Sequence, residues 1–308
     1  MTSTTHPKSS PAAAPGPVPP GPVVQRASRR RRRKARSTLN PSWLTYLLLG
    51  IITFVSVLPL YYTVVMASHT NAEMAAKVPP LLPNGSLFTN LKHALKLAPL
   101  NKGLINSVIV SGCVTIGTVA FCTIGGFAFA KLRFRGSSIL LGFCIMTMMV
   151  PTQMGIIPLY MLMARWGFAG HLQSVILPTL VTAFGLFFMR QYLTTAVPDD
   201  LIEAAFVDGA NSFRVFVSIV VPAARPAMAV LGMLTFLTTW NDFFWPIIAL
   251  NSQNPTMQVA FQGLASGYAP QQSVIMAGTL YGTVPVLIVF AVLGKQIVGG
   301  IMQGAIKG

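Results

Sequence analysis

The sequence predicts an all-α integral membrane protein with six transmembrane helices and one polar helix-turn-helix insert. Charged residues make up only 9% of the 308 residues, while hydrophobic residues make up 53% and the mean hydropathy is +0.63. Soluble globular domains carry roughly 25% charged residues. Six apolar stretches can each cross the roughly 30 Å hydrocarbon core as a helix of about 20 residues. We therefore expect residues 41–308 to form one six-helix transmembrane domain.

Residues 1–40 differ in composition from the rest of the chain. They are rich in Pro, Ala and Ser, and nine of the 22 basic residues lie before residue 37. Such a segment buries too little apolar surface to fold, so we expect a disordered basic tail. The run from Arg29 to Arg36 favours contact with membrane lipid over nucleic acid, because no aromatic residues or binding fold accompany it. The next apolar stretch exceeds the roughly 15 residues of a signal-peptide core, which predicts a retained helix.

Several of the apolar stretches contain proline, so we expect kinked spans. A soluble helix would break at an internal proline, but neighbouring helices in a membrane bundle can bind the freed carbonyl groups. The prolines concerned are Pro59, Pro151, Pro158, Pro178, Pro246 and Pro285. The six expected spans are Trp43–Met66, Leu104–Ala130, Ile139–Met163, Leu172–Met189, Met228–Leu250 and Val274–Leu293.

The Lys and Arg residues between the spans predict the orientation of the chain. Cytoplasmic segments of membrane proteins carry an excess of these residues. With a cytoplasmic N-terminus, 17 basic residues fall inside and 5 fall outside. Without the N-terminal tail the counts are 8 and 5, which is a weaker bias of the same sign. We expect both termini and the polar insert in the cytoplasm.

The polar insert covers residues 194–226 and concentrates negative charge. Four of the six acidic residues of the chain lie within ten positions of it. Pro198 suits the first position of a helix, and Asp199 and Asp200 fall in the first turn, where the helix dipole favours acids. Gly209 can adopt the left-handed conformation that ends a helix. The acidic residues are Asp199, Asp200, Glu203 and Asp208.

A second short helix is expected after Gly209. Asn211 or Ser212 can cap it, and its apolar residues share one face. Pro222 and Pro226 are expected to end or bend it. The insert is therefore predicted to be a helix-turn-helix knob outside the bilayer.

The chain lacks the residue patterns of an enzyme or a metal protein. No Gly-x-x-x-x-Gly-Lys-Ser/Thr loop occurs, because Gly294 and Lys295 are followed by Gln296. The spans hold no Ser/His/Asp or paired-carboxylate arrangement, and the four histidines have no paired spacing. We expect no catalytic site, cofactor or metal in this chain, so any chemistry belongs to a partner.

The insert carries a longer pattern that resembles a known family. Glu203-Ala204-Ala205, Gly209, Ile219 and Val221-Pro222 have the spacing of the EAA loop in permease subunits of bacterial ABC importers, whose pattern usually ends in Leu-Pro. Further stretches are similar to the carbohydrate-uptake branch, specifically to MalG-like subunits of maltose-type importers, from about residue 40 to the end. They include Asn106-Ser107, the residues 126–136, Ile157-Pro158-Leu159-Tyr160, Trp240-Asn241-Asp242-Phe243 and the terminal residues 304–308.

The resemblance implies a location in the bacterial plasma (inner) membrane, and it implies partners and roles for the insert. In this family the EAA loop forms coupling helices that sit in a groove of the ATPase subunit. Glu203 would contact the ATPase, Ala204 and Ala205 would allow close packing, and Gly209 would make the turn. The implied partners are a second homologous permease subunit, two cytoplasmic ATPase subunits that bind ATP, and an extracytoplasmic sugar-binding protein. The coupling segment spans residues 198–222 and includes Asp208, Ile219 and Pro222. The alternative is an amphipathic helix lying on the membrane.

A second candidate site lies in the predicted fifth span. An Asp with an adjacent Asn inside a span is costly and rarely faces lipid. We therefore expect one of two roles for Trp240, Asn241 and Asp242. They line the translocation path, or they form a hydrogen-bond clamp between helices. Gln153 is a weaker candidate of the same kind. Gly278 and Gly282 predict a close-packing face of the last span.

Two other classes of protein remain as alternatives. One is a secondary transporter or a membrane-embedded scaffold without an ATPase partner, but inverted repeats and buried charges are not evident. The other is a membrane-embedded enzyme, which would need clustered catalytic side chains.

Overall fold

The computed structural model describes residues 42–76, 78, 80–266 and 270–305. Every regular element within these ranges is a helix, and no strand occurs there. The basic tail predicted for residues 1–40 lies outside the described residues. The helices are α1 (Trp43–Ala67), α2 (Asn71–Met74), α3 (Leu87–Leu97), α4 (Leu100–Lys131), α5 (Ser137–Thr147), α6 (Ile156–Arg165), α7 (Gln173–Thr179), α8 (Ala183–Ala196), α9 (Asp199–Val207), α10 (Ser212–Val215), α11 (Val221–Trp240), α12 (Phe244–Ala249), α13 (Met257–Ala265) and α14 (Gln272–Ala305).

The helices confirm the predicted membrane fold class. The chain forms two compact units, residues 1–53 and 54–308, and the packing described below lies within the second. Five helical stretches are long and apolar enough to cross a membrane, and a bent pair of helices completes six spans if it counts as one. The five stretches are Trp43–Ala67, Leu100–Lys131, Gln173–Ala196, Ser212–Trp240 and Gln272–Val292.

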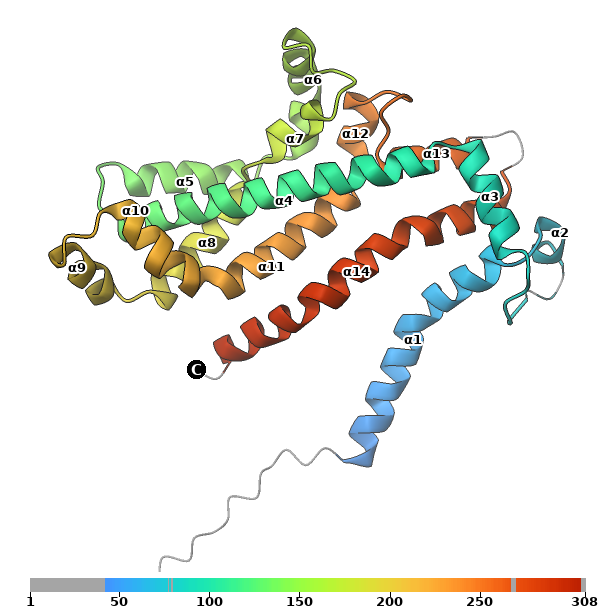
Figure 1. Cartoon of the computed structure of the whole chain (residues 1–308), viewed down its shortest axis with the longest axis horizontal. Helices are drawn as coiled ribbons and strands as arrows, with labels where there is room; N and C mark the ends of the chain where they lie inside the picture. The colour runs from blue at the N-terminus through green and yellow to red at the C-terminus, as the bar shows by residue number, and fades with distance from the viewer. Residues whose placement is uncertain (1–41, 77, 79, 267–269, 306–308) are drawn as a thin grey trace, which may run out of the picture. The chain divides into compact units, whose positions relative to one another are not determined.

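The third span is the bent pair. It was predicted as one helix over Ile139–Met163, but α5 ends at Thr147 and the following helical segment, residues 152–165, leaves at an angle of 92° (Figure 1). Pro151 explains the break, because it has no N–H and restricts the backbone of the residue before it. A 3-10 turn at Thr152–Gly155 then leads into α6.

The fifth span also differs from the prediction. Its helix begins at Ser212 and ends at Trp240, whereas the expected span was Met228–Leu250. Pro222 and Pro226 lie inside this continuous helix and do not end it, so the second helix of the insert and the fifth span are one rod.

A π-helical turn at Phe216–Val220 explains how the rod passes Pro222. In this turn the N–H of Val221 donates to the carbonyl of Phe216, five residues earlier. The ring of a proline presses on the carbonyl four residues before it in a regular helix, and a wider turn relieves that contact. Of the two outcomes expected at these prolines, an end of the helix is wrong, because neighbouring helices support the continuing rod. The regular α-helical hydrogen bonding is interrupted there by the π turn.

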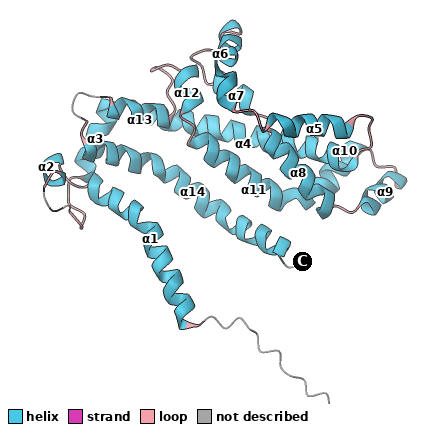
Figure 2. Ribbon diagram, turned by 180° about the vertical axis from the view of Figure 1, so that it is seen from behind, coloured by secondary structure: helices cyan, strands magenta, loops and turns pink. Residues whose placement is uncertain are grey.

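α4 is the helix on which the others pack. It contacts α8, α11 and α13 along its length (Figure 2). Its closest approach to the backbone of another helix is at Gly126, where an added Cβ would lie 2.7 Å from the Met189 Cβ and 2.8 Å from the backbone nitrogen of Arg190. Glycine at this position lets the backbones of α4 and α8 touch, as small residues do in membrane helix pairs.

The N-terminal part of α4 is fixed by two buried polar side chains. The Asn106 amide donates to the carbonyl of Pro255 at 2.8 Å, and the Ser107 hydroxyl accepts from the N–H of Met257 at 2.8 Å. These bonds satisfy backbone groups at the start of α13 that water cannot reach. They give the Asn-Ser pair of the sequence a structural role.

The predicted packing face of the last span is confirmed. An added Cβ at Gly278 would lie 2.7 Å from Leu264, and one at Gly282 would lie 2.5 Å from the ring of Phe261. Both neighbours belong to α13, so the glycines allow α14 to approach another helix of the same chain.

Replacing Gly126 should test the α4–α8 contact. We expect Gly126→Val to destabilise the protein by about 3 kcal/mol or more, because backbone atoms under 3 Å away cannot move aside cheaply. That corresponds to a loss of roughly 6 °C or more in the thermal midpoint of the purified protein in detergent. Gly112→Val is the matched control on the same helix, because nothing lies within 4 Å of an added Cβ there. Equal midpoints for the two variants would refute the close contact.

Candidate functional site

The first helix of the polar insert forms where the sequence predicted it. α9 begins after Pro198, and Asp199 and Asp200 occupy its first turn. It ends at Gly209, whose φ of 81° is left-handed. There the N–H of Ala210 donates to the carbonyl of Ala205 at 2.9 Å, and the N–H of Gly209 donates to Phe206 at 3.0 Å. This bond pattern is the Schellman motif, which satisfies the last carbonyls of a helix.

The second helix begins directly after this turn. The side-chain oxygen of Asn211 accepts from the N–H of Arg214 at 2.8 Å, so Asn211 is the capping residue of α10 and Ser212 is its first residue. The two-helix arrangement of the insert is therefore present, although its second helix continues into α11.

Apolar side chains attach the insert to the membrane spans. Val197, Ile202, Val215 and Val220 are buried and join one core with residues of α4, α8 and α11. The rings of Phe127 and Phe216 lie 5.7 Å apart in the same region. The insert therefore packs directly against the spans and is not merely connected to them by a flexible loop. Figure 1 shows it at one end of α4, with α3 at the other end.

The insert also presents apolar side chains to the outside. Val207 is 88% exposed and Phe213 is 75% exposed, and Leu201 and Phe206 are also exposed. Leu201, Phe206 and Val207 lie on α9, and Phe213 lies on α10 at the start of the rod that continues as the fifth span. Exposed apolar side chains grouped with acids on a short helix are typical of a helix that docks into a partner's groove.

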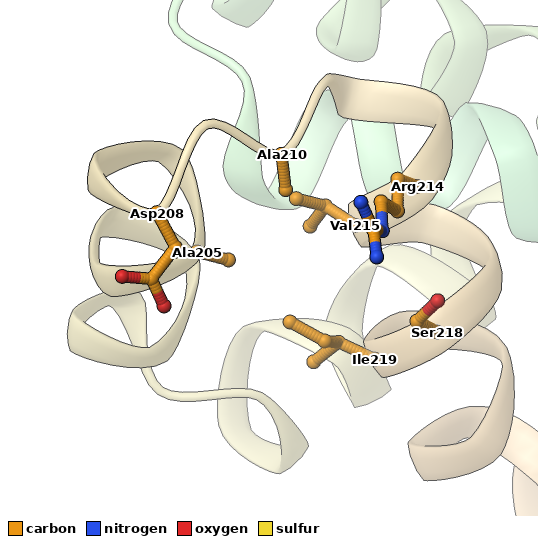
Figure 3. A pocket seen from close by; sticks show the side chains of 7 residues that line it. All are labelled: Ala205, Asp208, Ala210, Arg214, Val215, Ser218 and Ile219. Carbon is orange, nitrogen blue, oxygen red and sulfur yellow. The ribbon is translucent and has the colours of Figure 1, made fainter.

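A pocket of about 260 Å³ separates the two helices of the insert. Figure 3 shows Ala205 and Ala210 on one side, facing Ile219 and Arg214 on the other. The small side chains of the two alanines leave this space open. The pocket brings together three of the predicted coupling residues. They are Ala205, Asp208 and Ile219.

The remaining predicted coupling residues lie elsewhere on the insert. Glu203 lines a second pocket, of about 340 Å³, between α9 and the end of α4. Ala204 and Gly209 are exposed at the surface of the insert, and Pro222 is exposed on α11. The predicted set therefore spreads over the whole insert instead of forming one cluster.

Sequence reasoning missed an ion pair beside the second pocket. The ammonium of Lys131, the last residue of α4, donates to a carboxylate oxygen of Asp199 at 2.6 Å. It also donates to the carbonyl of Thr194 at 3.4 Å. The hydrogen bond and charge of Lys131 hold the pKa of the Asp199 carboxyl below its usual value. No other ion pair occurs among the residues that the structure describes.

The candidates for the translocation path lie at breaks between helices. α11 ends at Trp240, so Asn241 and Asp242 follow the span instead of lying inside it. The prediction of an acid inside a continuous helix is therefore wrong, because 241–243 form a break. Trp240 is buried and stacks on Phe236 at 5.6 Å, whereas Asn241 is exposed. Gln153 is exposed in the 3-10 turn that breaks the third span.

Asp242 has a local structural role at its break. Its carboxylate accepts from the N–H groups of Phe244 at 3.2 Å and Trp245 at 3.5 Å, which begin α12. Trp245 in turn donates from its indole nitrogen to the carbonyl of Ser174 at 3.1 Å and is buried against α7. Asp242 thus fixes the helix that carries this contact. Within the described part of this chain, Asp242 makes no hydrogen bond to another span. A clamp between helices of two subunits stays a prediction.

Comparison with known proteins identifies the family. Residues 122–302 match the model of the binding-protein-dependent transport system inner membrane component. The chain belongs to this family. The lactose transport system permease protein LacG of Rhizobium radiobacter is 30% identical over 272 residues, which cover 87% of this chain and 97% of LacG. The sn-glycerol-3-phosphate transport system permease protein UgpE of Yersinia pestis is 26% identical, covering 83% of this chain and 94% of UgpE.

The fold is also similar to a solved structure. A chain in the crystal structure of a bacterial ABC transporter involved in the import of the acidic polysaccharide alginate superposes with a TM-score of 0.70. It is 23% identical, and the match covers 82% of this chain and 94% of that chain. The resemblance drawn from the sequence motifs is confirmed, and this chain is a multi-pass inner membrane permease component.

Substitutions at Asp242 separate its structural role from a role in transport. We expect Asp242→Ala to destabilise the protein by about 1 kcal/mol, because α12 loses its acceptor, whereas Asp242→Asn keeps an acceptor and the native stability. The loss corresponds to roughly 2–4 °C in the thermal midpoint. Should both variants melt like the wild type, the capping role is refuted. If Asp242→Asn keeps its stability but loses uptake, the charge itself serves transport.

Proposed function

We propose that this permease subunit forms half of the path by which an ATP-driven importer takes up a sugar or oligosaccharide. The carbohydrate assignment is supported by the sequence motifs and by relatives whose names refer to lactose and to sn-glycerol-3-phosphate, both of which are rich in oxygen. The chain itself carries no catalytic site in this proposal, and ATP is bound by partner subunits. A secondary transporter or scaffold is not favoured, because the family matched is a component of binding-protein-dependent transport.

The observation that carries the proposal is the geometry of the insert. A short helix with acids in its first turn and exposed apolar residues stands at one end of α4, on a core shared with three helices of the membrane bundle. A partner that grips this helix can displace the spans, because packed cores transmit displacement instead of absorbing it. We infer that residues 198–222 couple an ATPase subunit to the spans, with Glu203 at the contact and Gly209 making the turn.

The proposed assembly contains a second homologous permease subunit, two cytoplasmic ATPase subunits and an extracytoplasmic sugar-binding protein. One chain leaves wide apolar surfaces uncovered: no residue of α5 is buried, and Ile139, Phe143 and Met146 are each more than half exposed. Such a helix needs lipid or another membrane chain beside it. A subunit that supplies half of a translocation path is expected to leave such apolar surfaces for a second membrane subunit to cover.

The exposed polar groups at the helix breaks are the candidates for that path. Asn241 and Gln153 are accessible from outside this chain, and Asp242 is half-buried. Irregular backbone at membrane depth is tolerated where it is buried in protein or lines a wet cavity. We propose that Asn241, Asp242 and Gln153 face the cavity between the two permease subunits. Trp240, which is buried within this chain, would support them from behind.

Variants of the insert test the coupling role. We expect Glu203→Lys and Gly209→Pro to lower uptake about fivefold or more, the size of a coupling free energy of about 1–3 kcal/mol, while the chain still inserts. Proline fixes φ at about −65°, which the turn at Gly209 cannot accept, and it removes the N–H that bonds Phe206.

Matched controls accompany both coupling variants. Glu203→Gln keeps size without reversing charge, and Gly209→Asn tolerates the left-handed turn, which has open space around an added Cβ. Uptake, ATP hydrolysis and co-purification of an ATPase should be measured on the same membranes. Full uptake and stimulated hydrolysis in Glu203→Lys and Gly209→Pro together would show that this segment is not the coupling element.

The orientation of the chain is testable by labelling. In a chain whose native cysteines are replaced, single cysteines at Ser37, Ser212 and Gly308 should resist an impermeant thiol reagent in intact cells, because the Lys/Arg bias places these segments inside. A cysteine at Gly85, which is exposed, should react. All four should react after permeabilisation. Labelling at Ser212 in intact cells would contradict both the orientation and the coupling role.

A further inference from the structure

The two helices of the insert are joined to the membrane spans in different ways. α10 continues through the π turn into α11, so the backbone carries any displacement of α10 into the fifth span. α9 lacks this continuity. Val197 and Pro198, both extended, separate it from α8, and the left-handed turn at Gly209 separates it from α10. Displacement of α9 can reach the spans rigidly only through side-chain contacts.

Contacts of two kinds tie α9 to the bundle: apolar packing, in which Ala205 lies against the same core as Ile202, and an ion pair. The side chain of Ile202 is buried in the core shared with α4 and α8, which resists separation but has little directional preference. The ammonium of Lys131 lies 2.6 Å from the Asp199 carboxylate and 3.4 Å from the carbonyl of Thr194. Since these three residues end α4, begin α9 and lie on α8, one ammonium joins three helices.

The surroundings make this ion pair stronger than an ordinary surface pair. The Lys131 side chain is only 3% exposed, although that of Asp199 is 70% exposed. An ammonium that is nearly buried suffers a large desolvation cost when its carboxylate leaves. Lys131 also sits at the C-terminal end of a helix and Asp199 at the N-terminal end of another, so each charge complements a helix dipole. The arrangement therefore favours a fixed distance between the two helix ends.

We propose that Lys131 and Asp199 form a clasp that makes α9 move together with the C-terminal end of α4. The two are positioning residues for coupling: a partner that displaces α9 then moves the second span through the clasp, while α10 moves the fifth span through the backbone. The inference rests on the proposed function of the insert. Glu203 and Phe206 line the pocket beside the clasp, so the partner contact and the clasp lie on the same helix.

Charge-removing variants test the clasp in the complete importer. Lys131→Met, Asp199→Asn and their combination should be reconstituted with the ATPase subunits and the binding protein in liposomes. The readout is the ratio of substrate taken up to ATP hydrolysed in the same vesicles. We expect each single variant to lower this ratio about fivefold. The double variant should be no worse than Asp199→Asn alone, because it no longer leaves an unpaired ammonium buried.

Conservative variants serve as controls. Lys131→Arg keeps the cation and should retain at least about half of the ratio. Lys102→Met removes an exposed cation near the other end of α4, which forms no ion pair among the described residues, and should leave the ratio unchanged. Unchanged ratios in both single variants, or single effects that multiply in the double variant, would overturn the clasp. A wild-type chain that shows no ATP-dependent uptake would overturn the proposed function instead, so the two failures are distinguishable.

Discussion

The direct contact between the backbones of α4 and α8 at Gly126 is the constraint on which the insert depends. Any side chain at this position would push α8 away, because Met189 and Arg190 lie within 3 Å of an added Cβ. The same two helices supply the core into which Val197 and Ile202 insert. If α4 and α8 lay further apart, these two side chains would have no packed surface to insert into, and α9 would no longer be held against the spans. The position of a functional helix thus follows from one residue in the interior of the bundle.

The two helices of the insert are connected to the membrane spans in different ways: α10 by continuous helical backbone, and α9 by side-chain contacts. α10 belongs to the same rod as the fifth span, although a π turn interrupts its regular hydrogen bonding. π turns in helices occur often at functional sites, because they shift the register of the residues that follow. α9 is held by the buried side chain of Ile202, by Ala205 packed against the same core, and by the ion pair of Asp199 with Lys131. A partner that binds both helices would therefore act on the second and fifth spans through connections of different stiffness.

The sequence predicted where α9 begins and ends, because the residues next to its ends determine this. It did not predict how α9 is attached to the spans, because that depends on contacts between residues far apart in the chain. Proline followed by two acids marked its start, and Gly209 marked its end, because these residues act on the backbone next to them. Pro222 and Pro226 did not end the helix, because neighbouring helices support the rod there. A single sequence does not show which helices will be neighbours. The pairing of Lys131 with Asp199 joins residues 68 positions apart. In the sequence Lys131 is followed by Arg133 and Arg135, and nothing marks it among these three basic residues as the partner of Asp199.

Polar contacts around α12 satisfy backbone groups near the breaks in the third and fifth spans. The carbonyl of Ala249 accepts from the N–H of Gly170 at 2.8 Å and from the Ser174 hydroxyl at 3.3 Å, and the carbonyl of Gly170 accepts from Asn254 at 3.0 Å. Backbone groups freed by a break at membrane depth must find such partners within the protein. Asp242 extends the same principle by capping α12. Asp242, which looked costly in a continuous span, therefore stabilises one of these breaks, whereas Asn241 and Gln153 stay exposed and are the residues proposed to face the translocation path.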